Sequence, residues 1–234
     1  MLPLQDDLHY LCVLYNEMRE SEAKELARNT EKTMPRKTSY VFLEGSISEV
    51  ADYVEKGMAD IGMVYFAGAQ AKAFRHILGH KELVYEEIST HEPCIYVGPR
   101  NPLYERESVS FEELENCRFI QSTRDYFSID HHLDSISLGM ARVGAFHNVV
   151  TTNSDNLLIE MLLYTDICNF GIKLLKEAYR IHAIRSLRIE GCGKCLSLGY
   201  IKRRKEHLGR EYLRLLELLR TQLVSEDEEE EQTG

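Results

Sequence analysis

The sequence has no apolar stretch long enough to cross a bilayer, since one helical span needs about 20 consecutive apolar residues. Its start, Met1–Asp7, lacks the basic residues and the apolar centre of a secretory leader. Both absences argue against a membrane protein and against an exported one. We therefore expect a cytoplasmic protein that has no membrane partner.

Excess positive charge is missing as well. The 234 residues carry a net charge of −10, but residues 225–234 hold six acids and no base, so residues 1–224 carry only −4. Proteins that coat nucleic acid need a basic surface, so we do not expect this chain to bind DNA by itself. Residues 225–234 are predicted to be a solvated, disordered acidic tail.

The sequence also lacks the common catalytic motifs. It contains no Gly-rich phosphate loop, no HExxH and no G-x-S-x-G. The acid pairs Glu86-Glu87 and Glu112-Glu113 are adjacent in sequence, so in regular structure their side chains point apart rather than toward one shared bond. We therefore expect no enzyme, no catalytic residue and no cofactor.

Six cysteines in a cytoplasmic protein are expected to be free thiols. Cys12, Cys94 and Cys168 lie in apolar runs and are predicted core residues. Cys192 and Cys195 have the spacing of a redox pair or of two zinc ligands, but a structural zinc ion needs four ligands and no second pair of this spacing exists. The alternative is a simple Gly-containing turn, and no metal site is predicted.

One stretch in the first third of the chain has the pattern of a strand–helix–strand unit. Tyr40–Leu43 is a short apolar run of strand length, and Ile61–Phe66 is a second, apolar nearly throughout. Between them, Ser46 and Glu49 have the spacing of a capping box at the start of a helix. One face of that helix is expected to carry Ile47, Val50, Ala51, Val54 and Met58. A right-handed crossover makes the two strands parallel and places the Ser46 turn at a carboxyl edge, where open α/β sheets bind ligands.

Further short apolar runs predict the other strands and helices. The expected strands are Leu8–Tyr15, Leu83–Tyr85, Cys94–Val97, Arg118–Ile120, His147–Thr151, Ile167–Ile172, Leu187–Ile189 and Leu196–Ile201. A helix is expected over Asn16–Thr33, capped by its first residue. Ser110 and Glu113 repeat the capping-box spacing. Thr152–Ser154 is expected to cap the apolar helix Leu157–Leu163.

Three segments are expected to lie outside helices and strands: Leu78–His80 as a loop, Gln121–Tyr126 as a polar turn, and Lys202–Lys205 as a solvated turn rather than a phosphate grip. The last helix is expected to present a core face made of Leu208, Tyr212, Leu215, Leu216, Leu219 and Leu223. A dimer seam is the alternative for this stripe, although only about two heptads fit.

In their order and spacing, several of these pieces resemble the effector-binding domain of LysR-type transcriptional regulators, from about Leu8 to Leu223. The residues that carry the resemblance are Leu43–Ser46, Val54–Ile61, Glu92–Val97, Asn101–Leu103, Val109–Leu114, Phe119-Ile120, Thr152–Ser154 before the Leu157–Leu163 helix, and Gly199–Arg204. The resemblance implies a periplasmic-binding-protein-like type II fold of class α/β, with two α/β subdomains and a ligand cleft between them. Residues 1–95 plus 196–224 would form subdomain I, and residues 96–195 subdomain II.

The same resemblance implies partners. A small-molecule effector would bind in the cleft, and the domain would form a side-by-side, antiparallel homodimer in which the Asn16–Thr33 helix packs near a second-subdomain helix of its partner. Members of the family bind DNA through a winged helix-turn-helix, which this sequence does not contain. The sequence could be an excised fragment of such a regulator or a natural protein that lacks the DNA-binding half, and both alternatives stay open.

The candidate effector-binding residues lie in turns at the expected carboxyl edges of the two sheets: Asn16, Ser46, Tyr65, Gln121, Ser122, Thr123, Tyr126 and Thr152. The resemblance itself points to Ser46, Tyr65 and Thr123. Several of these turns open helices, whose free N–H groups favour a small anion, above all a carboxylate. Arg124 could add a charge-assisted pair.

Three other functions stay open. A solute-binding protein for transport would need export or a lipid anchor, an enzyme on the same two-lobed fold would need a nucleophile and a base, and a scaffold would bind no ligand at all.

Overall fold

The structure is a computed structural model that describes residues 45–122, 149–152, 154–172, 182–209, 212–213 and 216–217. Its elements are α2 (Ile47–Glu55), β1 (Ile61–Ala67), the 3₁₀ turn η1 (Gly68–Gln70), α3 (Ala71–His80), β2 (Leu83–His91), β3 (Pro93–Val97), β4 (Ser108–Val109), α4 (Phe111–Leu114), β5 (Phe119–Ser122), β6 (Val149–Thr152), α6 (Asp155–Tyr164), β7 (Cys168–Ile172), β8 (Arg185–Ile189) and β9 (Leu196–Arg203). The expected strands Leu8–Tyr15 and Tyr40–Leu43, the helix Asn16–Thr33, Cys12 and the acidic tail lie outside the described residues.

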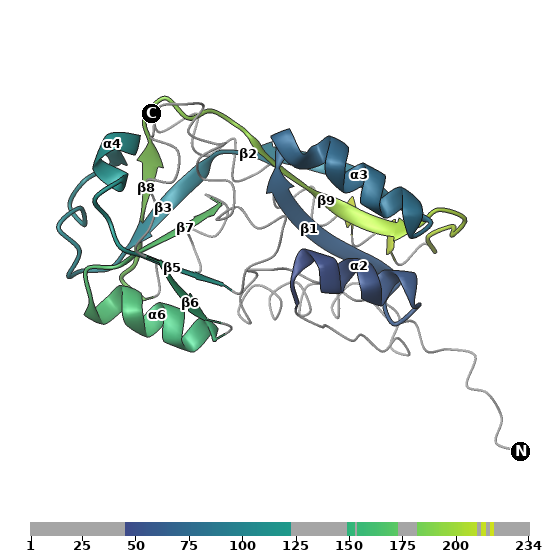
Figure 1. Ribbon diagram of the computed structural model, residues 1–234, viewed down its shortest axis with the longest axis horizontal. Coiled ribbons are helices and arrows are strands. Elements are labelled where there is room, and N and C mark those ends of the chain that lie inside the picture. The colour runs from purple at the N-terminus through teal and green to yellow at the C-terminus, as the bar shows by residue number, and fades with distance from the viewer. Residues whose placement is uncertain are drawn as a thin grey trace, which may run out of the picture.

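The strands form two separate sheets, and Figure 1 shows each with helices packed beside it. The first sheet has the order β1-β9-β2, in which β9 pairs antiparallel with both neighbours. The second has the order β4-β8-β3-β7-β5-β6 and mixes parallel and antiparallel pairs. The chain enters the second sheet between β2 and β3 and returns between β8 and β9. The expected class, α/β with two subdomains, is confirmed, while the exact boundaries stay a prediction.

Helix α2 begins where the sequence indicates. The Ser46 hydroxyl accepts the Glu49 N–H at 3.3 Å, and the Glu49 carboxylate accepts the Ser46 N–H at 2.8 Å. These two bonds satisfy donors that a helix start leaves without intrahelical partners. The buried face is made of Ile47, Val50, Ala51 and Val54, as expected. Met58 was wrongly placed on it, because the helix ends at Glu55 and this side chain is 52% exposed.

Helix α3 covers the segment expected to be a loop at Leu78–His80. The helix runs to His80, so that expectation is wrong. Only Phe74 and Leu78 are buried on it, one turn apart. Two apolar anchors give too weak a period to reveal a helix in the sequence, and packing against the first sheet supplies the rest.

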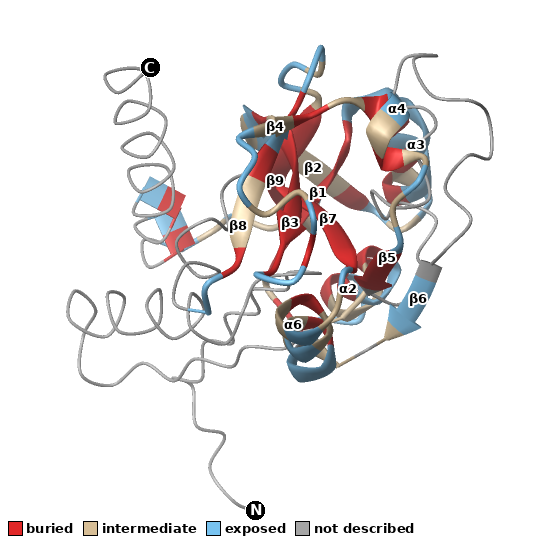
Figure 2. Cartoon of the chain, turned by 90° about the vertical axis from the view of Figure 1, so that its left-hand side faces the viewer, coloured by how far each residue is buried: buried red, intermediate tan, exposed pale blue. Residues whose placement is uncertain are grey.

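The buried residues of the first sheet face two cores. Val64 and Phe66 of β1 pack in a smaller cluster with the apolar faces of α2 and α3. Ile61, Met63 and Tyr65, which alternate with them, belong to a larger cluster that includes residues of the second sheet. Figure 2 shows this buried material, in red, concentrated in the strands. A strand buried on both faces has no polar alternation, which is why Ile61–Phe66 is apolar nearly throughout.

Strand β5 is longer than predicted. The expected polar turn from Gln121 is wrong at its first two residues, because Gln121 and Ser122 continue the parallel ladder to Thr151 and Thr152 of β6. Gln121 is only 3% exposed. Since a parallel neighbour lies far away in sequence, the extra pairing has no local signal in the residues that make it.

The prediction that the basic run Lys202–Lys205 forms a solvated turn is wrong for its first two residues. Lys202 and Arg203 belong to β9, and the Lys202 ammonium lies 2.9 Å from Glu86 on β2. The guanidinium of Arg203 donates to the carbonyl oxygen of Ala59 at 3.0 Å. Arg204 and Lys205 are exposed, as a solvated turn requires.

The other expected strands and helix starts that fall in the described residues agree with the structure. Strands occur at each of the expected runs Leu83–Tyr85, Cys94–Val97, Arg118–Ile120, His147–Thr151, Ile167–Ile172, Leu187–Ile189 and Leu196–Ile201, with ends shifted by a few residues. Ser110 and Ser154 cap α4 and α6. Tyr212 and Leu216 of the last predicted helix are buried in the larger core cluster. No helix in the described ranges is long and apolar enough to cross a membrane.

Candidate functional site

Ser46 caps the start of α2, and in Figure 1 the end of α2 that starts the helix is the one nearer the second sheet. The hydroxyl oxygen of Ser46 accepts one backbone N–H, from Glu49, and its own hydrogen remains able to donate. The N-terminal end of a helix also carries a partial positive charge. A helix start of this kind can bind a small anion or stabilise the helix alone.

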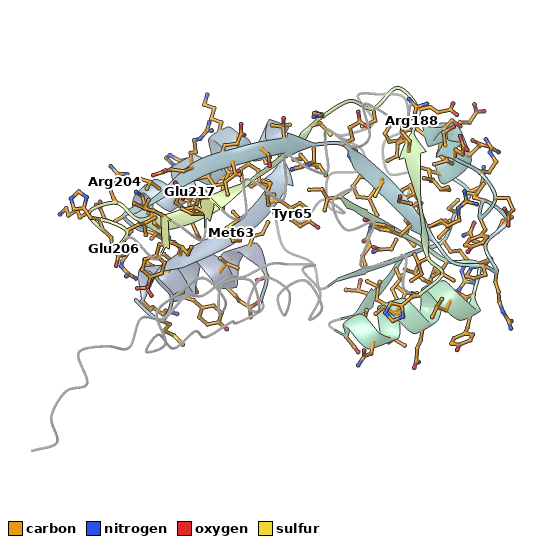
Figure 3. All side chains as sticks on the ribbon, turned by 180° about the vertical axis from the view of Figure 1, so that it is seen from behind. Met63, Tyr65, Arg188, Arg204, Glu206 and Glu217 are labelled. Atoms are coloured by element: carbon orange, nitrogen blue, oxygen red, sulfur yellow. The ribbon has the colours of Figure 1, made fainter. Side chains whose placement is uncertain are left out.

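Tyr65 lies near the end of β1, and Figure 3 shows it on the side of the first sheet nearest the second. It is only 2% exposed and packs in the larger core cluster. Its neighbour across the ladder is Leu198 of β9. The ring is therefore almost fully buried, and little of it is open to solvent.

The second sheet contributes the carboxyl ends of two parallel strands. Gln121 and Ser122 end β5 and lie beside Thr151 and Thr152 of β6. The hydroxyl oxygen of Thr152 accepts the N–H of Ser154, the cap of α6. The chain thus places three of the expected polar residues, Gln121, Ser122 and Thr152, side by side at one edge of this sheet, where α/β folds bind ligands.

The other three expected residues, Asn16, Thr123 and Tyr126, lie outside the described residues, as does Arg124. The structure brings Ser46 and Tyr65 to the facing end of the first subdomain and the β5–β6 residues to an edge of the second.

Asn169 is a candidate that sequence reasoning missed. It lies in β7, is 1% exposed, and donates from its amide nitrogen to the carbonyl oxygen of Ile120 on β5 at 2.8 Å. Its amide oxygen has no hydrogen-bond partner in the described part of the chain. An unpaired buried acceptor is costly, so a ligand donor that reached this oxygen would gain from pairing it. The available signal was one amide inside the apolar run Ile167–Ile172.

A polar cluster joins β2 to β9 in the first sheet. The phenol of Tyr85 hydrogen-bonds with the Ser197 hydroxyl at 2.8 Å, and Ser197 donates to Glu87. Burial, as the largest cause, raises the pKa of Tyr85 well above its usual value, so the phenol stays protonated at neutral pH. A neutral phenol paired in this way links two strands and has no role as a general base.

The described ranges contain no cluster of side chains suited to bind a metal ion. Nowhere in them are three or more histidine, cysteine, aspartate or glutamate side chains grouped so that they could hold an ion. Cys94 and Cys168 are buried in β3 and β7, as expected for core residues.

The sequence matches the family described as LysR substrate binding domain over residues 37–224. No curated protein matches this chain. Among solved structures, the effector-binding domain of QuiR in complex with shikimate is 10% identical with a TM-score of 0.65, and the match covers 92% of this chain and 96% of that one. The LysR family regulator HinK from Pseudomonas aeruginosa is 11% identical with a TM-score of 0.66, covering 94% and 72%.

A third similar structure is the C-terminal domain of a probable LysR family regulator from Rhodococcus sp. RHA1, 14% identical with a TM-score of 0.64, covering 91% and 98%. At these identities the structural matches establish the fold, which is that of the LysR effector-binding domains. The family match covers most of the chain, from the residues before α2 to those beyond Leu216. This chain belongs to the LysR substrate-binding domain family.

Proposed function

We propose that this chain is the ligand-sensing domain of a LysR-type transcriptional regulator and that it binds a small, anionic effector between its two subdomains. The observation that carries the proposal is the family match over residues 37–224. A similar domain, that of QuiR, has a small molecule, shikimate, in its structure. The polar ends of β5 and β6 and the start of α2 supply groups suited to such a ligand.

The preference for an anion rests on two capped helix starts. Ser46 opens α2 and Ser154 opens α6, and each serine leaves its own hydroxyl hydrogen able to donate. Helix N-termini attract negative charge through their N–H groups and dipole. A carboxylate that bridged the subdomains would satisfy donors on both sides.

Two other functions fit the same fold. A transport solute-binding protein would bind its ligand without any link to DNA, and an enzyme would turn its ligand over. An enzyme could use a hydroxyl beside a base, and among the described residues the Ser89 hydroxyl hydrogen-bonds with His91 Nε2 at 2.7 Å. The family match favours regulation over both.

The proposal extends to the partners. We infer that the domain pairs with a second copy of itself and that DNA binding resides in a helix-turn-helix segment rather than in the two ligand-sensing subdomains. The cytoplasmic location inferred from the sequence belongs to the same proposal.

A thermal-shift screen of small carboxylates tests the binding function, because a ligand that binds only the folded state raises its melting temperature. A hit is then titrated calorimetrically into Ser46→Ala and into Ser110→Ala. Both serines cap helices through capping boxes, but Ser110 caps α4 in the second subdomain. We expect both variants to lose about 1 kcal/mol of stability and only Ser46→Ala to lose affinity. Equal affinity in both would move the site away from α2, and a screen without hits would oppose the binding function.

A further inference from the structure

Two thiols face each other in the turn between β8 and β9. The Sγ atoms of Cys192 and Cys195 lie 4.0 Å apart, and both side chains are half-buried. A disulfide bond is about 2.0 Å long, so the sulfurs must approach by about 2 Å. Gly191, with a φ of +73°, and Gly193, around which a Cβ would meet nothing within 4 Å, leave the turn room for this movement.

The turn is attached to the first sheet at the point where the chain crosses between the subdomains. Cys195 donates its N–H to the carbonyl oxygen of His91, the last residue of β2, at 3.1 Å. Its own carbonyl oxygen accepts the N–H of Gly68, just after β1, at 2.7 Å. The next residue, Leu196, pairs with both Ala67 and His91. Any restraint on this turn is therefore transmitted to the ends of all three strands.

The other thiols in the described ranges are less suited to reversible oxidation. Cys94 and Cys168 are fully buried in central strands of the second sheet. The Cys168 sulfur also accepts the Asn101 amide at 3.2 Å. Cys117 is half-buried. The sulfur that it hydrogen-bonds belongs to Cys168, which is buried. Among the cysteines of the described ranges, only Cys192 and Cys195 combine proximity with exposure to a dissolved oxidant.

We propose that Cys192 and Cys195 are a redox modification site, at which a small organic disulfide oxidises the pair to an intramolecular disulfide. The Cys195 thiolate attacks one sulfur of the reagent, whose S–S bond breaks, and the first thiol leaves with the displaced electron pair and takes up a proton. The Cys192 thiol then loses its proton and attacks the Cys195 sulfur, releasing the second thiol. The protein loses two electrons and two protons, and one reagent disulfide becomes two thiols.

The order of attack follows from the hydrogen bond between the sulfurs. The contact between the sulfurs lowers the pKa of Cys195 and raises the pKa of Cys192. A thiolate is the attacking species in disulfide exchange. Cys195 is therefore the first nucleophile and Cys192 the resolving thiol. This site does not depend on the identity or existence of an effector.

The experiment treats the reduced full chain with glutathione disulfide, blocks the remaining thiols and maps the bonds by mass spectrometry. We expect a single Cys192–Cys195 bond. Cys192→Ser should stop at a glutathione adduct on Cys195, and Cys195→Ser should form its adduct roughly fivefold more slowly or worse. The control Cys117→Ser should oxidise at the wild-type rate to the same product.

Other results would overturn the proposal. They are a bond that maps to Cys117 and Cys168, wild-type protein that yields only glutathione adducts, and equal adduct rates in the two serine variants. Zinc bound by the reduced pair with no oxidation by glutathione disulfide would identify a metal site instead.

Hydrogen exchange tests whether the turn is attached to the first sheet. Oxidation should slow exchange in the peptide that contains Gly68, and Cys192→Ser treated in the same way should show no change. Unaltered exchange in the oxidised wild type would contradict transmission to the strands.

Discussion

The guanidinium of Arg203 donates a hydrogen bond to the carbonyl oxygen of Val54, 2.8 Å away, near the C-terminal end of α2. The two residues are 149 positions apart in sequence. The carbonyl groups at a helix end carry partial negative charge. The Val54 carbonyl oxygen also accepts the Gly57 N–H at 3.2 Å, so Arg203 adds a second hydrogen bond there and its charge complements the helix dipole. The same side chain contacts Glu206 through its other nitrogen, at 2.7 Å. Arg203 thus attaches α2 to the last strand of the first sheet.

Replacing Arg203 by glutamine should lower the free energy of unfolding by about 2 kcal/mol, because hydrogen bonds to charged groups contribute about 1.5–3 kcal/mol. Chemical denaturation followed by circular dichroism measures the change. Arg204→Gln is the matched control, since Arg204 is adjacent but exposed, and it should stay within about 0.5 kcal/mol of wild type. Equal losses in the two variants would contradict the role given to Arg203.

Gly98 lies where the end of β3 approaches the backbone of α6. A Cβ at this position would sit 1.8 Å from the carbonyl oxygen of Leu162, a backbone atom that cannot move alone. Gly98→Ala should therefore cost about 1–3 kcal/mol or more through overpacking, which lowers the melting temperature by about 2–4 °C per kcal/mol. Gly193→Ala, whose added Cβ meets open space, should melt close to wild type. If Gly98→Ala had the same melting temperature as Gly193→Ala, the close approach of Gly98 to Leu162 would be refuted.

The Lys81 ammonium lies 2.6 Å from Asp52 Oδ1 and 2.5 Å from Glu55 Oε2, both on α2. The hydrogen bond from Lys81 lowers the pKa of Asp52 below its ordinary value of 3.8. A carboxyl whose pKa is lower in the folded chain stabilises it above the ordinary pKa, and this contribution is lost as the pH falls through the folded value. The stability difference between wild type and Lys81→Gln should be largest near pH 7 and shrink below about pH 4.

Urea denaturation at several pH values tests this dependence. The difference should also shrink at high salt, because these side chains are partly exposed. Lys56→Gln serves as the control, since its ammonium is 3.6 Å from Asp52 and more exposed, and it should have a smaller effect. A Lys81→Gln effect that does not vary between pH 7 and pH 3 would exclude the ionic contribution.

Self-association can be measured directly. The proposed homodimer should scatter light as a particle of twice the 27.1 kDa chain mass, because isologous pairs are the commonest oligomers. A particle of single-chain mass at tens of micromolar would count against the proposed pairing.

The sequence by itself determined features whose cause is local. The capping boxes at Ser46 and Ser110 join residues three positions apart, so their spacing was enough to place two helix starts. The apolar run Ile61–Phe66 indicated a strand covered on both faces, as observed in β1. The order of such pieces was specific enough to identify the family.

The tertiary structure alone decided features whose partners are distant in the chain. Gln121 continues β5 because Thr151 lies beside it, and Arg203 is partly buried because the carbonyl of Val54 lies within its reach. Asn169 reveals its unpaired oxygen only once β5 and β7 are side by side. The sequence gives the spacing of Cys192 and Cys195, but the turn that aligns their sulfurs is held by His91 and Gly68, about a hundred or more residues earlier. Local hydrogen bonds and periodicity are encoded in neighbouring residues, whereas these contacts exist only after the two sheets have assembled.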